Sequence, residues 1–171
     1  VAEYREQIAE TNLATQTSAS AIRPVQAGPP LADLGITKAG PASVAPGGTL
    51  TVAGGSMQTL LGFTAGYSAN TTGTIWITSG QFDVRGDMIL GYQPPSLGRM
   101  VISNGAVTAR SAFVGDSTGV SGTLALYDGT MTVSSNMLVG YCPVSATGSV
   151  LVAGGSLFVT NQNGTAVLEV S

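Results

Sequence analysis

The residues that could do chemistry are few and widely spaced in this sequence of 171 residues. Histidine is absent, which removes the usual general base and the commonest metal ligand. Cys142 is the only cysteine, so an intrachain disulfide and a thiolate-rich metal cage are excluded. The side chains that could pair for acid–base work are Asp83, Asp87, Asp116, Asp128, Arg85, Arg99 and Arg110. Their spacing does not bring them to one place, and we expect no enzyme, no catalytic residue, no cofactor and no metal site.

Two less favoured hypotheses would use some of these carboxylates. An enzyme acting on polysaccharides would need clustered carboxylates, and its turnover would depend on an acidic residue such as Asp83. A calcium site would combine Asp116 or Asp128 with the carbonyl groups of turns. The sequence lacks the Asp-rich nonapeptides of calcium-binding rolls, which counts against the second hypothesis.

The composition indicates short strands and tight turns. Hydrophobic residues make up 43% of the chain and charged residues only 9%, which is the opposite of a disordered sequence. The 24 glycines are too many for a helical bundle. A net charge of −3 gives no surface for nucleic acid, and no apolar run is long enough for a transmembrane segment. The first residue is Val1 rather than methionine, so we expect either a removed targeting segment or a fragment.

A repeat of about 25 residues, each opening on glycine, governs the sequence after residue 47. The five segments begin at Gly48, Gly73, Gly98, Gly122 and Gly148. Each segment continues as Gly-x-apolar-x-apolar, the alternation of a strand with one buried face. The apolar pairs are Leu50/Val52, Ile75/Ile77, Met100/Ile102, Leu124/Leu126 and Val150/Val152. A second glycine follows seven residues later, where a corner or a positive φ is expected, at Gly55, Gly80, Gly105, Gly129 and Gly155.

Two further strands are expected in each repeat. The second begins at an apolar residue two positions after the corner glycine, namely Met57, Phe82, Val107, Met131 and Leu157. A third apolar stretch follows in most repeats, as in residues 88–90, 112–114 and 137–139. Three short strands and three corners per repeat predict an all-β fold, a right-handed parallel β-helix (β-solenoid) of about five turns over residues 48–171. A propeller blade or a leucine-rich repeat would need a longer or partly helical unit, and a sandwich would not hold one register five times.

Residues 1–47 do not share the repeat and are predicted to form an N-terminal arm. Residues 2–15 could form a short helix, with Tyr4 and Ile8 on one face. The segment that follows favours an extended path because it contains Pro24, Pro29, Pro30, Pro41 and Pro46. The predicted boundary between the arm and the solenoid therefore lies at Gly48.

The repeats resemble those of bacterial autotransporter passengers and other secreted β-solenoid surface proteins. The phrases that carry the resemblance are Gly48-Thr-Leu-Thr-Val-Ala-Gly-Gly-Ser-Met, Gly73-Thr-Ile-Trp-Ile-Thr-Ser-Gly-Gln-Phe and Gly148-Ser-Val-Leu-Val-Ala-Gly-Gly-Ser-Leu. The resemblance covers about 124 residues and is specific for the fold. It implies an extracellular or cell-surface protein that serves as a stalk, an adhesin or a surface layer.

Equivalent residues of successive turns should stack into rows on the outside of the solenoid. The row between the two buried residues of the first strand reads Thr51, Trp76, Val101, Ala125, Leu151. Four of the five are apolar where an exposed face should be polar, so we expect this row to be an assembly face covered by the arm or by a neighbouring subunit. A second row, Tyr67, Tyr92 and Tyr141 with Asp116 between, forms a tyrosine ladder. It is expected to stack structurally, or else to bind glycans.

These rows predict a structural protein. No capping helix or charged strand follows the last repeat, so its edge is expected to accept another copy and to give a homopolymeric filament, with the arm contacting a neighbour. The alternative is an adhesin or a carbohydrate-binding fragment of a larger secreted protein. Asn70 and Asn163 lie in N-glycosylation sequons at predicted turns, which makes them candidate modification sites.

Overall fold

The computed structural model describes residues 35–38, 42–43, 48–142 and 145–171. These residues all belong to one compact unit, Ala32–Ser171, and they form a β-solenoid of about four turns in which no helix occurs. The expected helix over residues 2–15 and most of the expected arm lie outside the described residues. The count of five turns and the right-handed sense stay predictions.

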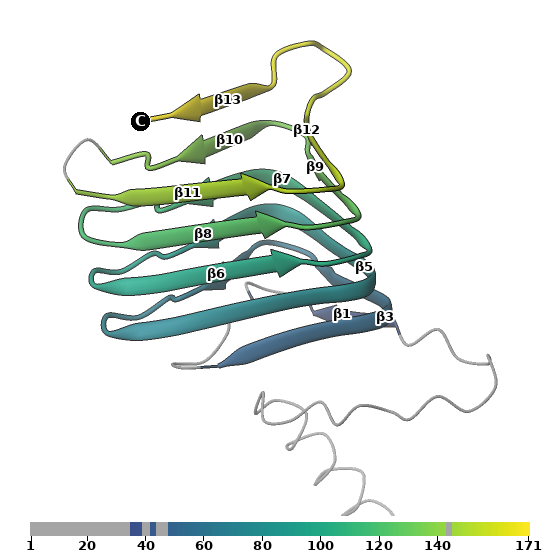
Figure 1. Cartoon of the computed structure of the whole chain (residues 1–171), viewed down its shortest axis with the longest axis horizontal. Coiled ribbons are helices and arrows are strands. Elements are labelled where there is room, and N and C mark those ends of the chain that lie inside the picture. The colour runs from purple at the N-terminus through teal and green to yellow at the C-terminus, as the bar shows by residue number, and fades with distance from the viewer. Residues whose placement is uncertain (1–34, 39–41, 44–47, 143–144) are drawn as a thin grey trace, which may run out of the picture. The chain divides into compact units, whose positions relative to one another are not determined.

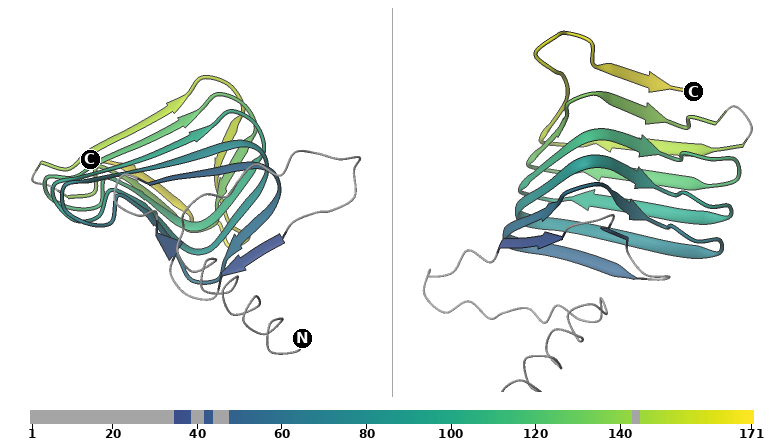
Figure 2. Two further views of the ribbon diagram at one scale, coloured as in Figure 1. Left: turned by 90° about the horizontal axis from the view of Figure 1, so that it is seen from below. Right: turned by 180° about the vertical axis from the view of Figure 1, so that it is seen from behind.

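Every strand pair is parallel, and three strand-bearing faces surround the core (Figures 1 and 2). The first face contains the start of β3 (Thr49–Thr59), the start of β5 (Thr71–Leu90), β6 (Ser96–Ile102), β8 (Ser121–Leu126) and β11 (Thr147–Val152). The second contains β1 (Gly35–Lys38), the end of β3, the middle of β5, the start of β7 (Ala106–Val114), β9 (Thr130–Val133) and β12 (Ser156–Val159). The third contains β2 (Ala42–Ser43), β4 (Phe63–Ala65), the ends of β5 and β7, β10 (Asn136–Val139) and β13 (Val167–Val170).

The predicted period is confirmed by the strand register. The leading glycines Gly73, Gly98, Gly122 and Gly148 are register partners in successive turns. The second-strand residues Met57, Phe82, Val107, Met131 and Leu157 form another continuous column. The corner glycines Gly55, Gly80, Gly105, Gly129 and Gly155 all have positive φ, as expected from their place between two strands.

The solenoid begins before the predicted boundary at Gly48. Strand β1 pairs with β3 and strand β2 pairs with β4, in each case parallel to the strand above. Ile36 is the register partner of Met57, and Ala42 is the register partner of Phe63. Residues 35–38 and 42–43 therefore supply the second and third faces with strands that the glycine-led pattern does not reveal, because this part of the sequence lacks the Gly-x-apolar-x-apolar opening.

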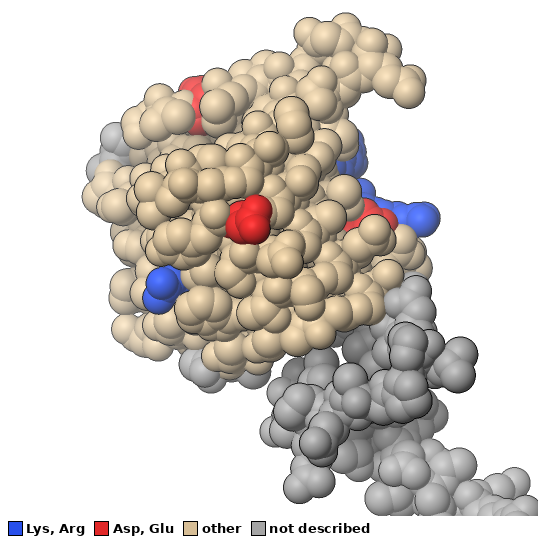
Figure 3. Space-filling view, turned by 45° about the vertical axis from the view of Figure 1, so that its right-hand side comes forward, with Lys and Arg blue, Asp and Glu red and all other residues tan. Residues whose placement is uncertain are grey.

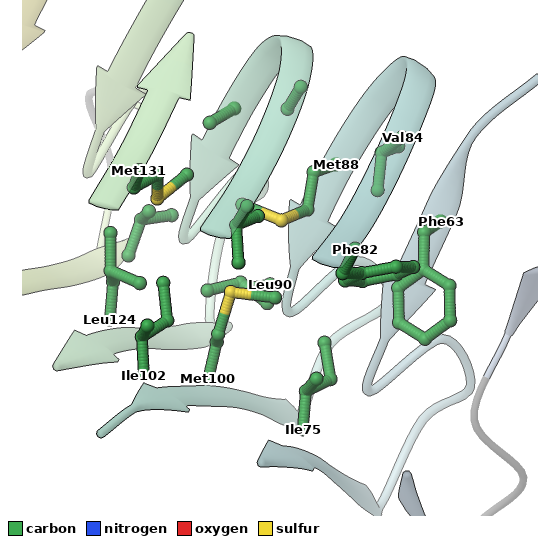
Figure 4. Packing of buried hydrophobic residues seen from close by; sticks show 14 of the residues in the cluster. Phe63, Ile75, Phe82, Val84, Met88, Leu90, Met100, Ile102, Leu124 and Met131 are labelled. Atoms are coloured by element: carbon green, nitrogen blue, oxygen red, sulfur yellow. The ribbon is translucent and has the colours of Figure 1, made fainter. Parts of the chain in front are cut away.

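The core is a column of apolar side chains stacked inside the turns (Figure 4). Phe63 and Phe82 meet edge to face, with ring centroids 5.2 Å apart. Methionine, isoleucine and leucine fill the layers beyond them, as at Met88, Met100 and Ile102, which are fully buried. Thr59 is an exception, because its hydroxyl oxygen is buried and has no hydrogen-bond partner among the described residues. Burial of this kind costs free energy that an apolar side chain would not.

Candidate assembly surface

The predicted assembly face is only partly open. Trp76, Val101, Ala125 and Leu151 are register partners on the first face, as the repeat requires. However, Val101 is 1% exposed and Ala125 is 5% exposed, whereas Trp76 and Leu151 are 36% and 48% exposed. The guanidinium of Arg99 lies over the Trp76 ring, 5.6 Å from its centroid, at a distance typical of a cation–π contact. The row therefore offers two separated apolar side chains rather than one continuous strip.

The tyrosine ladder is a stacked pair followed by a separate aromatic contact. Tyr67 and Tyr92 stack with their centroids 5.4 Å apart and their planes 17° from parallel. Asp116 occupies the next position, and beyond it Tyr141 packs edge to face against Phe113. The backbone ladder continues through all four positions, as in the bond from the Tyr141 N–H to the Gly115 carbonyl. Each ring of the stacked pair uses one face on its neighbour, which leaves less aromatic surface for a sugar.

Close pairs of glycines hold this ladder in place. Each glycine that ends a third strand lies against the glycine that opens the next repeat, the pairs being Gly66/Gly73, Gly91/Gly98, Gly115/Gly122 and Gly140/Gly148. A Cβ on Gly98 would lie within 3.0 Å of backbone atoms of Gly91 and Ala65, closer than real side chains come. Glycine at the opening position of the repeat is therefore a requirement for backbone contact, and it fixes where each loop and its tyrosine begin.

Charged side chains are sparse on the described surface (Figure 3). On the second face, Gln58 donates a hydrogen bond to Asp83 over 2.7 Å, Thr108 donates another, and Arg85 lies 3.6 Å away. Burial alone would raise the pKa of Asp83, but the hydrogen bonds from Thr108 and Gln58, with the charge of Arg85, outweigh it and hold the pKa below its ordinary value. Asp83 and Arg85 thus meet, in a network that links three successive turns.

Asp116 has the opposite electrostatic environment. Its partial burial, and to a lesser degree the charge of Asp87, raise the pKa of its carboxyl above the ordinary value. Among the residues that the structure describes, no three acidic or cysteine side chains are grouped so as to hold a metal ion. The geometry thus gives a hydrogen-bonded network at Asp83 and, at Asp116, a partly buried carboxyl whose charged form is disfavoured.

The two sequons lie at exposed turns. Asn70 adopts a φ of 59°, and its N–H bonds to the Pro95 carbonyl of the next loop. Asn163 lies in the loop between β12 and β13, where the Asn161 side chain accepts a hydrogen bond from the Thr165 N–H. Both asparagine side chains are exposed, as an acceptor of a glycan must be. Whether they are modified stays a prediction.

The most extensive apolar exposure lies on the last coil, formed by β11, β12 and β13. Several inward register positions that are buried in the coil below are exposed here. Val152, the partner of Leu126, is 46% exposed, and Leu168, the partner of Met137, is 54% exposed. Val170, the partner of Val139, reaches 72%. Sequence reasoning predicted an open edge here but did not name these side chains, although their repeat positions mark them as inward-facing.

The backbone of this coil is open as well. Within the described residues, β11 pairs only with β8, β12 only with β9 and β13 only with β10. Each of these strands therefore has N–H and C=O groups on one edge without a strand partner. At the opposite end, β1 and β2 likewise have one strand partner each among the described residues. In the part of the chain that the structure describes, the two ends of the solenoid are thus parallel sheet edges, which are templates for a further strand.

The fold and these two edges define the chain as a parallel β-solenoid of repeated glycine-led coils. Comparison with protein-family models, with curated protein sequences and with solved structures finds no match to this chain. In the part of the chain that the structure describes, no helix is long and apolar enough to cross a membrane.

Proposed function

We propose that the protein is a structural subunit of an extracellular or cell-surface fibre and that it assembles by end-to-end stacking of its solenoid. The supporting observation is the apolar exposure of the last coil, where Val152, Leu168 and Val170 stand at positions that are core positions in the coil below. Burying such side chains contributes roughly 25 cal/mol for each Å² of apolar surface removed from water. A further coil is the object whose shape fits this surface.

The open strand edges support the same function. Strands added to β12 and β13 would continue two parallel ladders and satisfy the backbone groups on their open edges. Because the two ends of the solenoid are different surfaces, such a contact is head-to-tail. A head-to-tail contact that does not close on itself yields a filament. The low content of charged residues removes one common means of protecting sheet edges from association.

Further features of the proposal follow from the sequence. Parallel crossovers are right-handed in nearly all proteins, so the coils are assigned a right-handed sense. The five glycine-led segments of the sequence assign about five turns. The resemblance to secreted surface proteins assigns the extracellular location. The N-terminal arm is assigned a contact with the neighbouring subunit.

Glycan binding is the alternative function, and the tyrosine ladder would carry it. Tyr67 and Tyr92 are stacked on each other, which already accounts for their repeat positions. The stacking of the two rings therefore explains the tyrosine ladder without a bound glycan.

The experiment compares two lysine substitutions at exposed apolar positions. Val170→Lys places a charge on the open end, and Tyr127→Lys places the same charge on a side of the solenoid where the native residue is 50% exposed. Assembly is measured by sedimentation velocity over a range of protein concentrations and by negative-stain microscopy. We expect filaments from the native chain and from Tyr127→Lys, and a loss of filaments from Val170→Lys, because the joint would bury an unpaired ammonium group.

Circular dichroism on each variant confirms that the strands are intact, since Val170 is mostly exposed in the isolated chain. A native chain that remains monomeric at every concentration, or filaments that survive Val170→Lys, would overturn the proposal. Binding of the monomer to a glycan array that Tyr92→Ala abolishes would favour the alternative.

A further inference from the structure

We infer that two copies join through two specific strand pairs: β1 of one copy on β12 of the other, and β2 on β13. This inference rests on the proposed function and adds to it the partner strands and their register. The occupant of the open end is therefore a second copy of this chain. Its β1 and β2 strands are short and already hold the second and third faces of the solenoid.

The register on the second face follows from the column that runs through the whole molecule. Starting at β1, the outward column reads Thr37, Gln58, Asp83, Thr108, Thr132 and Phe158. Among the described residues, its first and last members have a strand partner on one side only. If the next copy continues the column, Thr37 becomes the neighbour of Phe158. The adjacent inward column then places Ile36 over Leu157, which repeats the apolar stacking seen in every turn below.

The third face gives an independent column with the same result. It reads Ser43, Thr64, Ile89, Phe113, Leu138 and Glu169. Continuation places Ser43 beside Glu169 and Ala42 over Leu168, whose side chain is exposed in the isolated chain. A slip of one residue would place Ser43 rather than Ala42 over Leu168, so the apolar pattern selects this register.

The first face does not carry the joint. By the spacing of the repeats, the segment that would precede β1 and cover β11 includes Pro29 and Pro30. Proline has no N–H to donate to a ladder, which confines it to the edges of sheets. These residues lie outside the described part of the chain. The joint is therefore assigned to two strand pairs.

The corner loop between β12 and β13 limits how the two pairs form. Six positions separate Met131 from Met137 in the coil below, whereas eleven separate Leu157 from Leu168. Figure 1 shows the longer loop rising beyond the level of β13. It must stay outside the paired strands, so each pair forms separately on its own face.

Disulfide trapping between copies tests the register. All variants carry Cys142→Ser, which removes the native thiol. One protein carries Thr37→Cys and a second carries Phe158→Cys, and a matching set carries Ser43→Cys and Glu169→Cys. In-register neighbours on adjacent strands lie about 4.8 Å apart, within the range that a disulfide spans. Mixing each pair under oxidised glutathione should give a dimer that reductant dissolves, while each single variant alone stays monomeric on a denaturing gel.

Offset pairs are the matched controls. Thr37→Cys mixed with Ser156→Cys, and Ser43→Cys mixed with Val167→Cys, are displaced by two residues, which places their Cα atoms about 8 Å apart and out of reach. The expected result is a loss of the dimer band in both controls. Dimers from the offset pairs, or from a single variant with itself, overturn the inferred joint.

Sedimentation of the same oxidised and reduced mixtures separates this inference from the function on which it rests. Filaments without in-register disulfides would overturn the joint and leave the structural function standing. The absence of both filaments and disulfides would overturn the function itself. Trapping in both in-register pairs, with filaments that persist after reduction, supports both.

Discussion

Replacing Gly98 with alanine tests whether the glycine repeat is a requirement of backbone contact. The added methyl group would lie within 3.0 Å of the Gly91 nitrogen, the Ala65 carbonyl and the Leu90 carbonyl carbon. All three are backbone atoms of strands held in ladders, so none can rotate away as a side chain would. The N–H of Gly91 donates to the Ala65 carbonyl over 2.8 Å, and this bond lies directly in the path of the methyl group.

The expected cost follows from these contacts. Overpacking against side chains typically costs about 1–3 kcal/mol, and a net hydrogen bond contributes about 0.5–1.5 kcal/mol. With backbone atoms on both sides, we expect Gly98→Ala to lower the free energy of unfolding by about 3 kcal/mol or more. Gly164→Ala is the control, because Gly164 has a φ of +66° and no heavy atom within 4 Å of the new methyl group. Backbone strain alone should cost it about 1 kcal/mol.

Urea unfolding followed by circular dichroism measures both variants. The two slopes must agree with that of the native chain, since a changed slope would signal partial unfolding of the solenoid rather than a uniform loss of stability. If Gly98→Ala costs no more than Gly164→Ala, the close approach at the glycine pairs is not what the repeat preserves, and the reasoning fails.

Four further predictions concern side chains. The pKa of Asp83 is lowered, so this group stabilises the fold above pH 3.8, and its contribution is lost as the pH falls through the folded pKa. Asp83→Asn should remove this part of the loss of unfolding free energy in acid. The pKa of Asp116 is raised, so its charge costs stability as the pH rises from 3.8 through the folded pKa. Asp116→Asn should therefore stabilise the protein at pH 7 and have little effect in acid. Urea unfolding as a function of pH measures the Asp83 and Asp116 variants. A double-mutant cycle of Tyr67→Ala and Tyr92→Ala should give a coupling free energy of about 0.5–1.5 kcal/mol, and a coupling near zero would show that the stacked pair does not stabilise the fold. Thr59→Val should raise the free energy of unfolding by about 1–2 kcal/mol because the buried hydroxyl has no partner among the residues that the structure describes, and a loss of stability would indicate that it has one.

The parts of the fold that repeat in type and spacing could be predicted from the sequence. Gly98 and Gly122 indicate the period of the repeat. Met100 and Leu124 indicate which side of each strand faces the core, because a period-2 pattern has only one buried face. The strands β1 and β2 could not be predicted in the same way. They are held by partners in the next coil, and Ile36 and Ala42 have too few patterned neighbours in the sequence to reveal it.

The candidate site was predictable in position but not in exposure. The row of Trp76, Val101, Ala125 and Leu151 lies in register as expected, yet the two middle members are buried. Exposure depends on the sizes and rotamers of side chains in adjacent turns, which a single repeat does not contain. Similarly, the importance of Val170 emerges only when its partner in the coil below is known.

The stacking of equal coils also decides how the protein would respond to force. The ladders run along the axis of the solenoid, so an axial pull acts on the hydrogen bonds of one coil at a time rather than shearing many together. Successive coils repeat every 24 to 26 residues, as in the steps from Arg99 to Thr123 and from Thr123 to Ser149. Each coil that detaches would release about 85 Å of extended chain. A fibre of such subunits would therefore lengthen in equal steps under load, dissipating energy at each step before any covalent link is strained.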